Sequence, residues 1–262
     1  MVELTDLEIR QIQIDILKDI SKFCDVHSIR YSLAYGSLLG AIRHRGYIPW
    51  DDDIDIWMPR ADFNRFVKEY GNDDSPYKVG YYNKDPHYPY MFAKVYNCLT
   101  TVDEDLFLPY MMGVFIDVFP MDCWNDSGYK IIRLLDYALR IKTYRPSKKR
   151  NIIKNVAICF GKAFLLPLSL SIIRRMIEQI RQKYDGEREE IGYMLGIYRY
   201  KERFRREDIF ARQNTALFEN IIVSIPSNYT KILTQLYGNY MELPPKDKQI
   251  SHHHYVAYRK GE

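Results

Sequence analysis

Residues 31–59 carry the most informative pattern in the chain, YSLAYGSLLGAIRHRGYIPWDDDIDIWMP. Residues 31–35 form an apolar run that predicts a buried strand, and Gly36-Ser37 follows it directly. Gly36 allows the backbone to approach a ligand closely, and Ser37 is placed to cap a short helix over residues 38–42. The free amides and the dipole of a helix N-terminus both favour an anion. We therefore predict that Gly36 and Ser37 bind a phosphate group.

An acidic cluster follows, with aspartates at positions 51, 52, 53 and 55. If residues 53–57 form a strand, Asp53 and Asp55 share one face, because side chains alternate along a strand. Two carboxylates on one face repel each other unless a cation lies between them, and oxygen ligands favour Mg²⁺ or Mn²⁺ with substrate phosphates completing the shell. We predict that Asp53 and Asp55 are catalytic metal ligands, with Asp51 and Asp52 as turn or supporting residues. A solvated acidic loop is the alternative.

A third carboxylate interrupts the apolar stretch at residues 113–120, GVFIDVFP. An isolated acid in such a strand costs several kcal/mol unless a cation neutralises it. Asp117 is therefore the predicted third metal ligand, and a buried salt bridge to Lys or Arg is the alternative. Lys94 lies in a predicted strand over residues 91–96 and is placed to reach a phosphate, with a surface position as its alternative. Asp122, after the strand, is expected to be a turn or cap residue.

The remaining elements follow from periodicity and capping signals. Thr5 and Glu8 form a capping box that opens an amphipathic helix over residues 5–26, and Pro59 opens another helix. Residues 77–82, 91–96 and 98–103 predict strands of a meander. Residues 222–225 predict a short strand or an apolar loop, and a helix begins at Pro226-Ser227 and ends near Gly238.

The middle of the chain, residues 127–183, predicts helices and is strongly basic. No acid occurs between Tyr137 and Ile177, and basic residues flank an apolar stretch at residues 156–170. Such a segment resembles an interfacial membrane element, because anionic headgroups attract its charges while its apolar side enters the lipid boundary. A buried helical hairpin with a solvated basic face is the alternative. Residues 184–200 are expected to link this region back to the core.

Composition limits the classes of function. The chain has 262 residues, which suits one large domain or a core with an insert, and its net charge of +4 gives no argument for binding nucleic acid. Its four cysteines have no paired spacing, which argues against a zinc site or disulfide framework and favours a reducing compartment. No signal peptide or membrane span is predicted, since Lys162 and Pro167 interrupt the most apolar stretch. We expect a cytoplasmic protein, with peripheral contact to the inner face of the membrane if the basic segment is interfacial.

Together these motifs resemble the LicD family of bacterial phosphocholine transferases, which is related to the fukutin proteins. The resemblance rests on residues 35–46 (YGSLLGAIRHRG), 48–55 (IPWDDDID), 115–122 (FIDVFPMD) and 236–245 (LYGNYMELPP), with the pair His252-His253. It implies an α+β fold, with a nucleotidyltransferase-like mixed sheet core flanked by helices and a helical insert. The implied division is a catalytic core at residues 1–124, a basic insert at 125–200 and a C-terminal helical part at 201–262.

The resemblance also implies an activity. The family transfers a phosphorylated alcohol, commonly phosphocholine from CDP-choline, to a hydroxyl of a cell-surface glycan precursor and releases CMP. In the mechanism that we expect for this activity, Asp53 and Asp55 hold Mg²⁺ or Mn²⁺ against the diphosphate, Asp117 bridges a metal that activates the acceptor, and Arg43 and Lys94 neutralise phosphate. The expected partners are a CDP-alcohol and a glycan or lipid-linked glycan.

Two alternatives and two further roles remain open at this stage. Nucleotidyl transfer from a nucleoside triphosphate is the first alternative, and a non-catalytic membrane-associated scaffold is the second. Trp50, Trp57 and Trp124 are candidates to box a choline cation. The run His252-His253-His254 is expected to be solvent-exposed, with a metal or phosphate role as the alternative.

Overall fold

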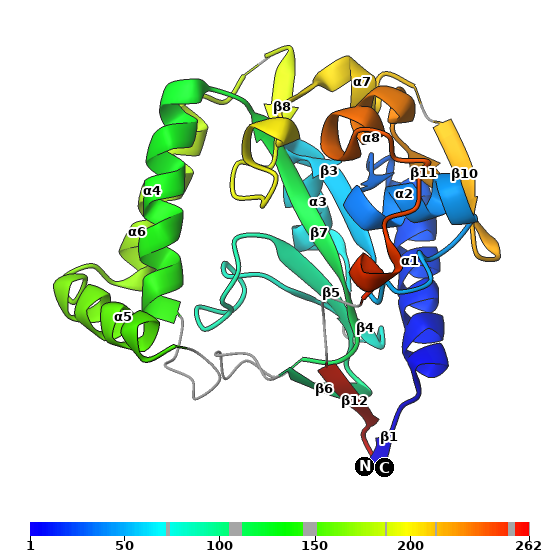
Figure 1. The fold of residues 1–262 in the computed structure, drawn as a ribbon, viewed down its shortest axis with the longest axis horizontal. Helices are drawn as coiled ribbons and strands as arrows, with labels where there is room; N and C mark the ends of the chain where they lie inside the picture. Colours follow the sequence, from blue (N-terminus) through cyan, green and yellow to red (C-terminus); the bar gives the residue numbers. More distant parts are fainter. Residues whose placement is uncertain are drawn as a thin grey trace.

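The computed structural model describes residues 1–71, 74–104, 112–143, 151–186, 188–212, 214–250 and 255–261. A seven-stranded sheet forms its centre, and the main path of this sheet runs β2-β3-β7-β5-β4 (Figure 1). The strands on the path are β2 (Ser32–Leu33), β3 (Asp55–Pro59), β7 (Phe115–Cys123), β5 (Ala93–Asn97) and β4 (Tyr77–Gly80). β3 and β7 pair in parallel, whereas the other pairs on this path are antiparallel. The predicted α+β class with a mixed sheet is confirmed.

Two further strands extend the sheet beyond the end of β7. β8 (Glu190–Gly192) pairs with the last residues of β7, and β9 (Phe204–Arg205) pairs with β8. Residues 184–200, predicted to link the basic region back to the core, thus also contribute a short strand to the sheet. The strand was not predicted, because three residues with polar flanks are too few to give a periodic signal.

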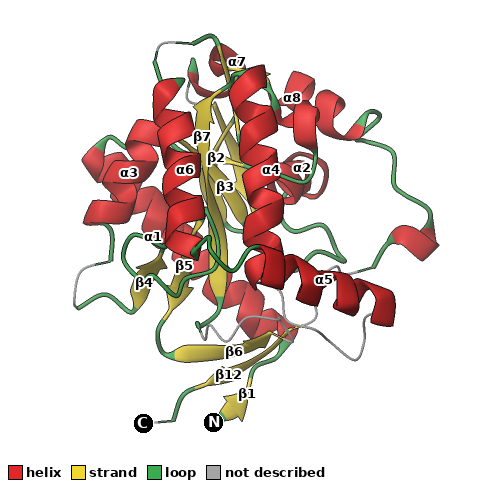
Figure 2. Cartoon of the chain, turned by 90° about the vertical axis from the view of Figure 1, so that its left-hand side faces the viewer, coloured by secondary structure: helices red, strands yellow, loops and turns green. Residues whose placement is uncertain are grey.

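A second, three-stranded sheet joins the two ends of the described chain. β12 (Tyr255–Arg259) lies between β1 (Val2–Glu3) and β6 (Thr100–Glu104), so the termini lie close together (Figures 1 and 2). The predicted meander is wrong at its third strand, since β6 pairs with β12 and β5 pairs with β7. A partner about 150 residues away leaves no local signal in the sequence. Residues 222–225, for which a short strand and an apolar loop were both open, lie in a strand, because β11 (Ile221–Ile225) forms a hairpin with β10 (Asn214–Phe218).

One group of helices lies on the right-hand side of the sheet in Figure 1 and includes α1, α2 and α8. Thr5 and Glu8 form the predicted capping box of α1 (Asp6–His27), and Pro59 precedes α3 (Arg60–Glu69) as predicted. α7 (Arg206–Phe210) and α8 (Tyr229–Tyr237) complete the C-terminal part, with short 3-10 turns at Arg199–Glu202 and Lys246–Lys248. The prediction for α2 (Tyr35–His44) needs correction. It begins three residues earlier than expected, and Ser37 does not cap it, because Ala34 is the N-cap residue.

The other group covers the opposite side and comes from the predicted insert. Its helices are α4 (Asp126–Thr143), α5 (Ile152–Phe164) and α6 (Leu170–Lys183). Figure 2 shows α4 and α6 side by side along the sheet and α5 projecting away from them. Leu135, Ile173 and Ile177 belong to the same hydrophobic cluster as the central strands. None of the helices in the described ranges is long and apolar enough to cross a membrane.

Asp122 joins helices α3 and α6 to the sheet, which corrects its predicted role as a turn or cap residue. It lies within β7 and its carboxylate accepts two hydrogen bonds from Arg60 of α3, both at 2.7 Å. Arg181 of α6 approaches the same carboxylate at 3.5 Å. Because a buried carboxylate requires such partners, Asp122 ties α3, β7 and α6 together.

Candidate active site

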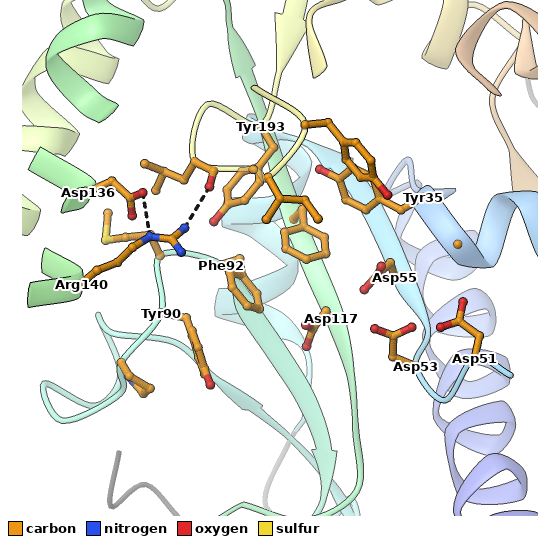
Figure 3. A pocket seen from close by; sticks show the side chains of 18 of the residues that line it. Tyr35, Asp51, Asp53, Asp55, Tyr90, Phe92, Asp117, Asp136, Arg140 and Tyr193 are labelled. Atoms are coloured by element: carbon orange, nitrogen blue, oxygen red, sulfur yellow. Dashed lines mark hydrogen bonds and ion pairs between the residues drawn. The ribbon is translucent and has the colours of Figure 1, made fainter. Parts of the chain in front are cut away.

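One cavity of about 540 Å³ opens beside the parallel pair β3 and β7. Its walls come from the start of α2, the loop before β3, both parallel strands, the segment before β5, helix α4 and the segment after β8. A cavity of this size suits a small-molecule substrate. Figure 3 shows aspartates gathered at one end of it and aromatic side chains along its middle.

Asp55 and Asp117 face this cavity because of strand register. They are direct partners in the parallel pairing of β3 and β7, so their side chains project from the same face of the sheet. The backbone of each is fixed. The amide of Asp55 donates to Ser37 Oγ at 2.8 Å, and the amide of Asp117 donates to the carbonyl of Ile54 at 2.8 Å. Two predicted ligands that are 62 positions apart in the sequence thus lie on adjacent strands.

Asp53 and Asp51 bring two more carboxylates to the same end of the cavity. The predicted strand start at Asp53 is wrong, since β3 begins at Asp55 and Asp53 belongs to the preceding loop. Oxygen atoms of Asp51, Asp52 and Asp53 lie within 4.8 Å of one another. Among the residues that the structure describes, Asp51 and Asp53 line the cavity and Asp52 does not.

Gly36 lies against this acidic cluster. A Cβ atom at this position would come within 2.5 Å of a carboxylate oxygen of Asp51. A larger residue would therefore displace Asp51, which explains why glycine occupies the first turn of α2 here.

The electrostatics of the cluster fit a cation. Burial raises the pKa of Asp55 well above its ordinary value, and the charges of Asp53, Asp117 and Asp51 raise it further, whereas Lys94 opposes them. A divalent cation would relieve this repulsion, and a set of carboxylate oxygens suits a hard ion such as Mg²⁺ or Mn²⁺. The residues present therefore fit the predicted metal.

Lys94 pairs with Asp117 and is buried. Its Nζ atom lies 2.7 Å from Asp117 Oδ1 and 3.4 Å from the ring centroid of Phe115, and the residue is 4% exposed. The alternative of a surface position is thus excluded, and the salt bridge considered for Asp117 is present. Lys94 is not among the described residues that line the cavity. Its contact is with a carboxylate of the cluster, and a contact with phosphate stays a prediction.

Two more predicted phosphate ligands lie outside the described cavity lining. Ser37 is buried beneath Asp55, as the hydrogen bond above shows. Arg43 donates through Nη1 to the carbonyls of Tyr240 at 2.8 Å and Glu242 at 3.3 Å, so it holds the C-terminal segment against α2. Of the predicted phosphate-binding residues, Gly36 is the one that the structure places in the cavity wall.

Aromatic side chains form the middle of the cavity, and the sequence interpretation missed most of them. The rings of Phe92 and Phe119 lie 4.6 Å apart, and those of Phe119 and Tyr193 lie 5.0 Å apart. Tyr35, Tyr90, Tyr198 and Tyr237 also line it. The signal in the sequence was the high tyrosine count, 23 residues, which gives no positions.

The tryptophans proposed to box choline divide between the cavity and the core. Trp50 lines the cavity, whereas Trp57 is fully buried and Trp124 stacks on Tyr129 at 4.6 Å. The terminal His252-His253-His254 run lies outside the described residues.

Glu202 lies behind the cavity wall and contacts two of its lining residues, Tyr35 and Tyr198. It is fully buried, accepts a hydrogen bond from the amide of Tyr198 at 2.7 Å and accepts another from the hydroxyl of Tyr35. Tyr35 adopts a left-handed backbone conformation, φ 40°, at the start of α2, and this contact helps to hold it there. Burial raises the pKa of Glu202 to about 7, against hydrogen bonds that lower it. The segment after β8 is thereby fixed to the start of α2.

Comparisons with known proteins identify relatives of this chain. Residues 28–126 match the family model described as LicD/FKTN/FKRP, nucleotidyltransferase domain. The chain is 31% identical to the lipopolysaccharide cholinephosphotransferase LicD of Haemophilus influenzae, over 98% of this chain and 99% of that protein. It is also 34% identical to an uncharacterized protein of Rickettsia typhi, over 23% of each chain.

Proposed function

The chain belongs to the LicD family, as its motifs predict, and we propose that it transfers a phosphorylated alcohol to a hydroxyl of a cell-surface glycan precursor. The alcohol is most simply choline, because its relative from Haemophilus influenzae is a lipopolysaccharide cholinephosphotransferase. The proposed donor is a CDP-alcohol, and CMP is the product that leaves.

One observation carries this proposal. The parallel register of β3 and β7 sets Asp55 beside Asp117 at the acidic end of a substrate-sized cavity. Carboxylates arranged in this way suit metal-assisted transfer at a phosphorus atom. Asp53, Asp55 and Asp117 would hold Mg²⁺ or Mn²⁺, which supplies Lewis acidity to the diphosphate oxygens when bound.

The residues of the chain then perform the remaining tasks. Lys94 holds the Asp117 carboxylate in place, and Ser37 fixes the backbone of Asp55. The acceptor hydroxyl oxygen forms a bond to the phosphorus that bears the alcohol, and the bond from that phosphorus to the bridging oxygen breaks. CMP leaves with that oxygen and the electron pair, and the hydroxyl proton passes to solvent. Positioning and electrostatic stabilisation account for most of the acceleration in reactions of this kind.

The aromatic middle of the cavity supports choline as the alcohol. A quaternary ammonium ion is attracted to the faces of aromatic rings. Phe92, Phe119 and Tyr193 form a continuous aromatic wall, and Trp50 lies among the lining residues. We assign the choline headgroup to this wall, in place of the buried Trp57 and Trp124.

Helix α5 supports a peripheral contact with membrane at the inner face of the cell membrane, where a lipid-linked acceptor would be presented. Phe160 is 73% exposed and Phe164 is 85% exposed, and no residue of α5 is buried. Lys154 and Lys162 lie on the same helix. Apolar side chains with flanking lysines suit the boundary of an anionic bilayer. We refer to the exposed apolar side chains of α5 and the turn after it as the α5 face: Ile152, Ile153, Val156, Phe160, Phe164 and Leu166.

A panel of donors tests the function. The protein is incubated with Mg²⁺ and with CDP-choline, CDP-ethanolamine, CDP-glycerol or CDP-ribitol, and release of CMP is measured. We expect one CDP-alcohol, CDP-choline first, to give CMP. Release of pyrophosphate from a nucleoside triphosphate, with no CMP from any CDP-alcohol, would favour nucleotidyl transfer instead.

A further inference from the structure

A glutamine on the buried face of α1 contacts the backbone behind the acidic end of the cavity. Gln13 lies on the same face of the helix as Ile9 and Leu17, and its exposed fraction is 0%. Burial of an amide side chain is unfavourable unless the amide forms hydrogen bonds. The contacts of Gln13 therefore explain why a polar residue occupies this position. The chemistry proposed above gives it no role.

The amide nitrogen of Gln13 joins the two segments that carry the proposed metal ligands. It donates to the carbonyl of Asp52 at 2.9 Å and to the carbonyl of Phe115 at 3.3 Å. Asp52 immediately precedes Asp53 in the acidic loop. Phe115 begins β7, two residues before Asp117. One buried side chain thus bridges the acidic loop and the strand of the third ligand.

Tyr47 fixes the orientation of this amide. Its hydroxyl donates to Gln13 Oε1 at 2.8 Å, which turns the amide nitrogen towards the two carbonyls. Arg10, three positions before Gln13 on α1, supports the same loop. It donates to the carbonyls of Pro49 at 3.0 Å and Asp51 at 2.7 Å. Side chains of α1 therefore bind the backbone of the acidic loop at three carbonyls.

The separation between the loop and β7 matters for binding a cation. Asp51 and Asp53 belong to a loop and Asp117 belongs to a strand, so their spacing depends on contacts between the two segments. Mg²⁺ requires near-ideal octahedral geometry, and residues behind the ligands set that geometry. Repulsion between carboxylates favours their moving apart. A bridge between the two backbones opposes this movement.

We propose that Gln13, oriented by Tyr47, is a positioning residue of the metal site and sets the separation between the acidic loop and Asp117. This inference rests on the proposed function, which assigns a metal ion to these carboxylates. Gln13 acts through the backbone carbonyls of Asp52 and Phe115, so its effect is on the affinity for the ion.

Binding of Mn²⁺, measured by the electron paramagnetic resonance signal of the free ion, tests this role without turnover. Gln13→Met keeps a side chain of similar length and removes both hydrogen bonds. We expect it to lower the Mn²⁺ affinity by about tenfold or more, as for other residues that orient metal ligands. Ile20→Ala is the matched control, because Ile20 is also fully buried in α1, two turns further along the helix. It should lower the Tm and leave the Mn²⁺ affinity unchanged.

Tyr47→Phe provides a milder variant and a thermodynamic cycle. It leaves the amide nitrogen of Gln13 in place and removes the group that orients it, so we expect a smaller loss of Mn²⁺ affinity. If Tyr47 acts through Gln13, Tyr47→Phe should cause no further loss when it is added to Gln13→Met.

Three results would overturn the proposal: unchanged Mn²⁺ affinity in both single variants, fully additive losses in the double variant, or an equal loss in Ile20→Ala. Should Gln13→Met not fold, Tyr47→Phe decides, since a lower affinity supports the proposal and an unchanged one overturns it. Failure of the unaltered protein to bind Mn²⁺ would overturn the metal site and this inference together. Equal binding by the unaltered protein and the variants would overturn this inference alone.

Discussion

Asp55 is the residue of the acidic cluster whose ionisation opposes folding most strongly. It is half-buried, and three neighbouring carboxylates add to the effect of desolvation in raising its pKa. A raised pKa means that the folded state holds the proton more tightly than the unfolded state, so the stability of the metal-free protein falls as pH rises above the ordinary value of 3.8. The arrangement is unfavourable for folding and favourable for binding a cation.

Asp55→Asn should therefore separate stability from activity. In EDTA at neutral pH we expect its Tm to rise by about 2 °C or more, the shift that accompanies about 1 kcal/mol in a chain of this size. The difference from the unaltered protein should shrink as pH falls through 3.8, because the carboxyl then becomes protonated in the unfolded state as well. Transfer activity should fall at least about 100-fold, because Lewis-acid assistance is worth several kcal/mol. A lower Tm together with retained activity would contradict the assignment.

Lys94 provides a second prediction at this scale. Its side chain is 5% exposed and that of Asp117 is 14% exposed, so removal of the ammonium leaves a largely buried charge. We expect Lys94→Met to lower the free energy of unfolding by about 3 kcal/mol, as for other broken buried pairs. Lys94→Met combined with Asp117→Asn should recover much of this loss in urea unfolding. A single variant as stable as the unaltered protein would show that the pair does not stabilise the fold.

At the scale of elements, the cavity depends on how the segment after β8 is attached to α2. Glu202 makes this attachment through Tyr198 and Tyr35. Burial raises the pKa of Glu202 from 4.5 to about 7. Protonated Glu202 therefore contributes fully to the free energy of unfolding below about pH 4.5. This contribution is lost as pH rises towards 7, by up to about 3 kcal/mol.

Glu202→Gln, a neutral isostere, should flatten this pH dependence. We expect the free energy of unfolding of the variant to change less than that of the unaltered protein between pH 5 and 7, measured by urea titration at each pH. Glu207→Gln, which alters an exposed residue of α7, is the control and should keep the original slope. The explanation fails if both variants follow the curve of the unaltered protein.

The strands and loops of the site also show which of its residues can be predicted from the sequence. Asp55 and Asp117 could be predicted because each is an acid in an apolar strand, and such an acid needs a partner wherever the strand lies. Tyr193 and Glu202 could not, since each gains its role from a chain segment distant in sequence. The pairing of β6 with β12 was missed for the same reason, because local patterns do not specify long-range partners.

At the scale of the whole molecule, the net charge of +4 is small and its distribution is uneven. Exposed apolar side chains line α5, and the stretch from Tyr137 to Ile177 around it contains basic residues and no acid. Buried contacts such as that of Asp122 with Arg60 and Arg181 hold the flanking helices to the sheet. The turn after α5 is joined to α4, which lines the cavity, because Lys142 Nζ donates to the carbonyl of Leu165 at 2.7 Å.

We expect this surface to recruit the protein to anionic membranes. In flotation assays, the protein should bind vesicles containing phosphatidylserine and not neutral ones. The assays use low salt because salt screens the attraction between exposed charges. The double variant Phe160→Glu/Phe164→Glu should lower binding by about tenfold or more, because each buried phenylalanine contributes more than about 1 kcal/mol. Leu7→Glu, at an exposed apolar residue of α1, is the matched control. Equal binding to neutral vesicles, or an equal loss in the control, would contradict the interfacial role.

The central claim is that four carboxylates at one end of the cavity support metal-dependent phosphoalcohol transfer. The most direct measurement follows CDP-choline by phosphorus NMR with a glycan acceptor, with Mg²⁺ present or removed by EDTA, for the unaltered protein, Asp55→Asn and Asp117→Asn. We predict that CMP and a new phosphodiester appear together, only with the metal and only with both aspartates intact. Formation of the phosphodiester in EDTA, or at an undiminished rate in either variant, would contradict the account.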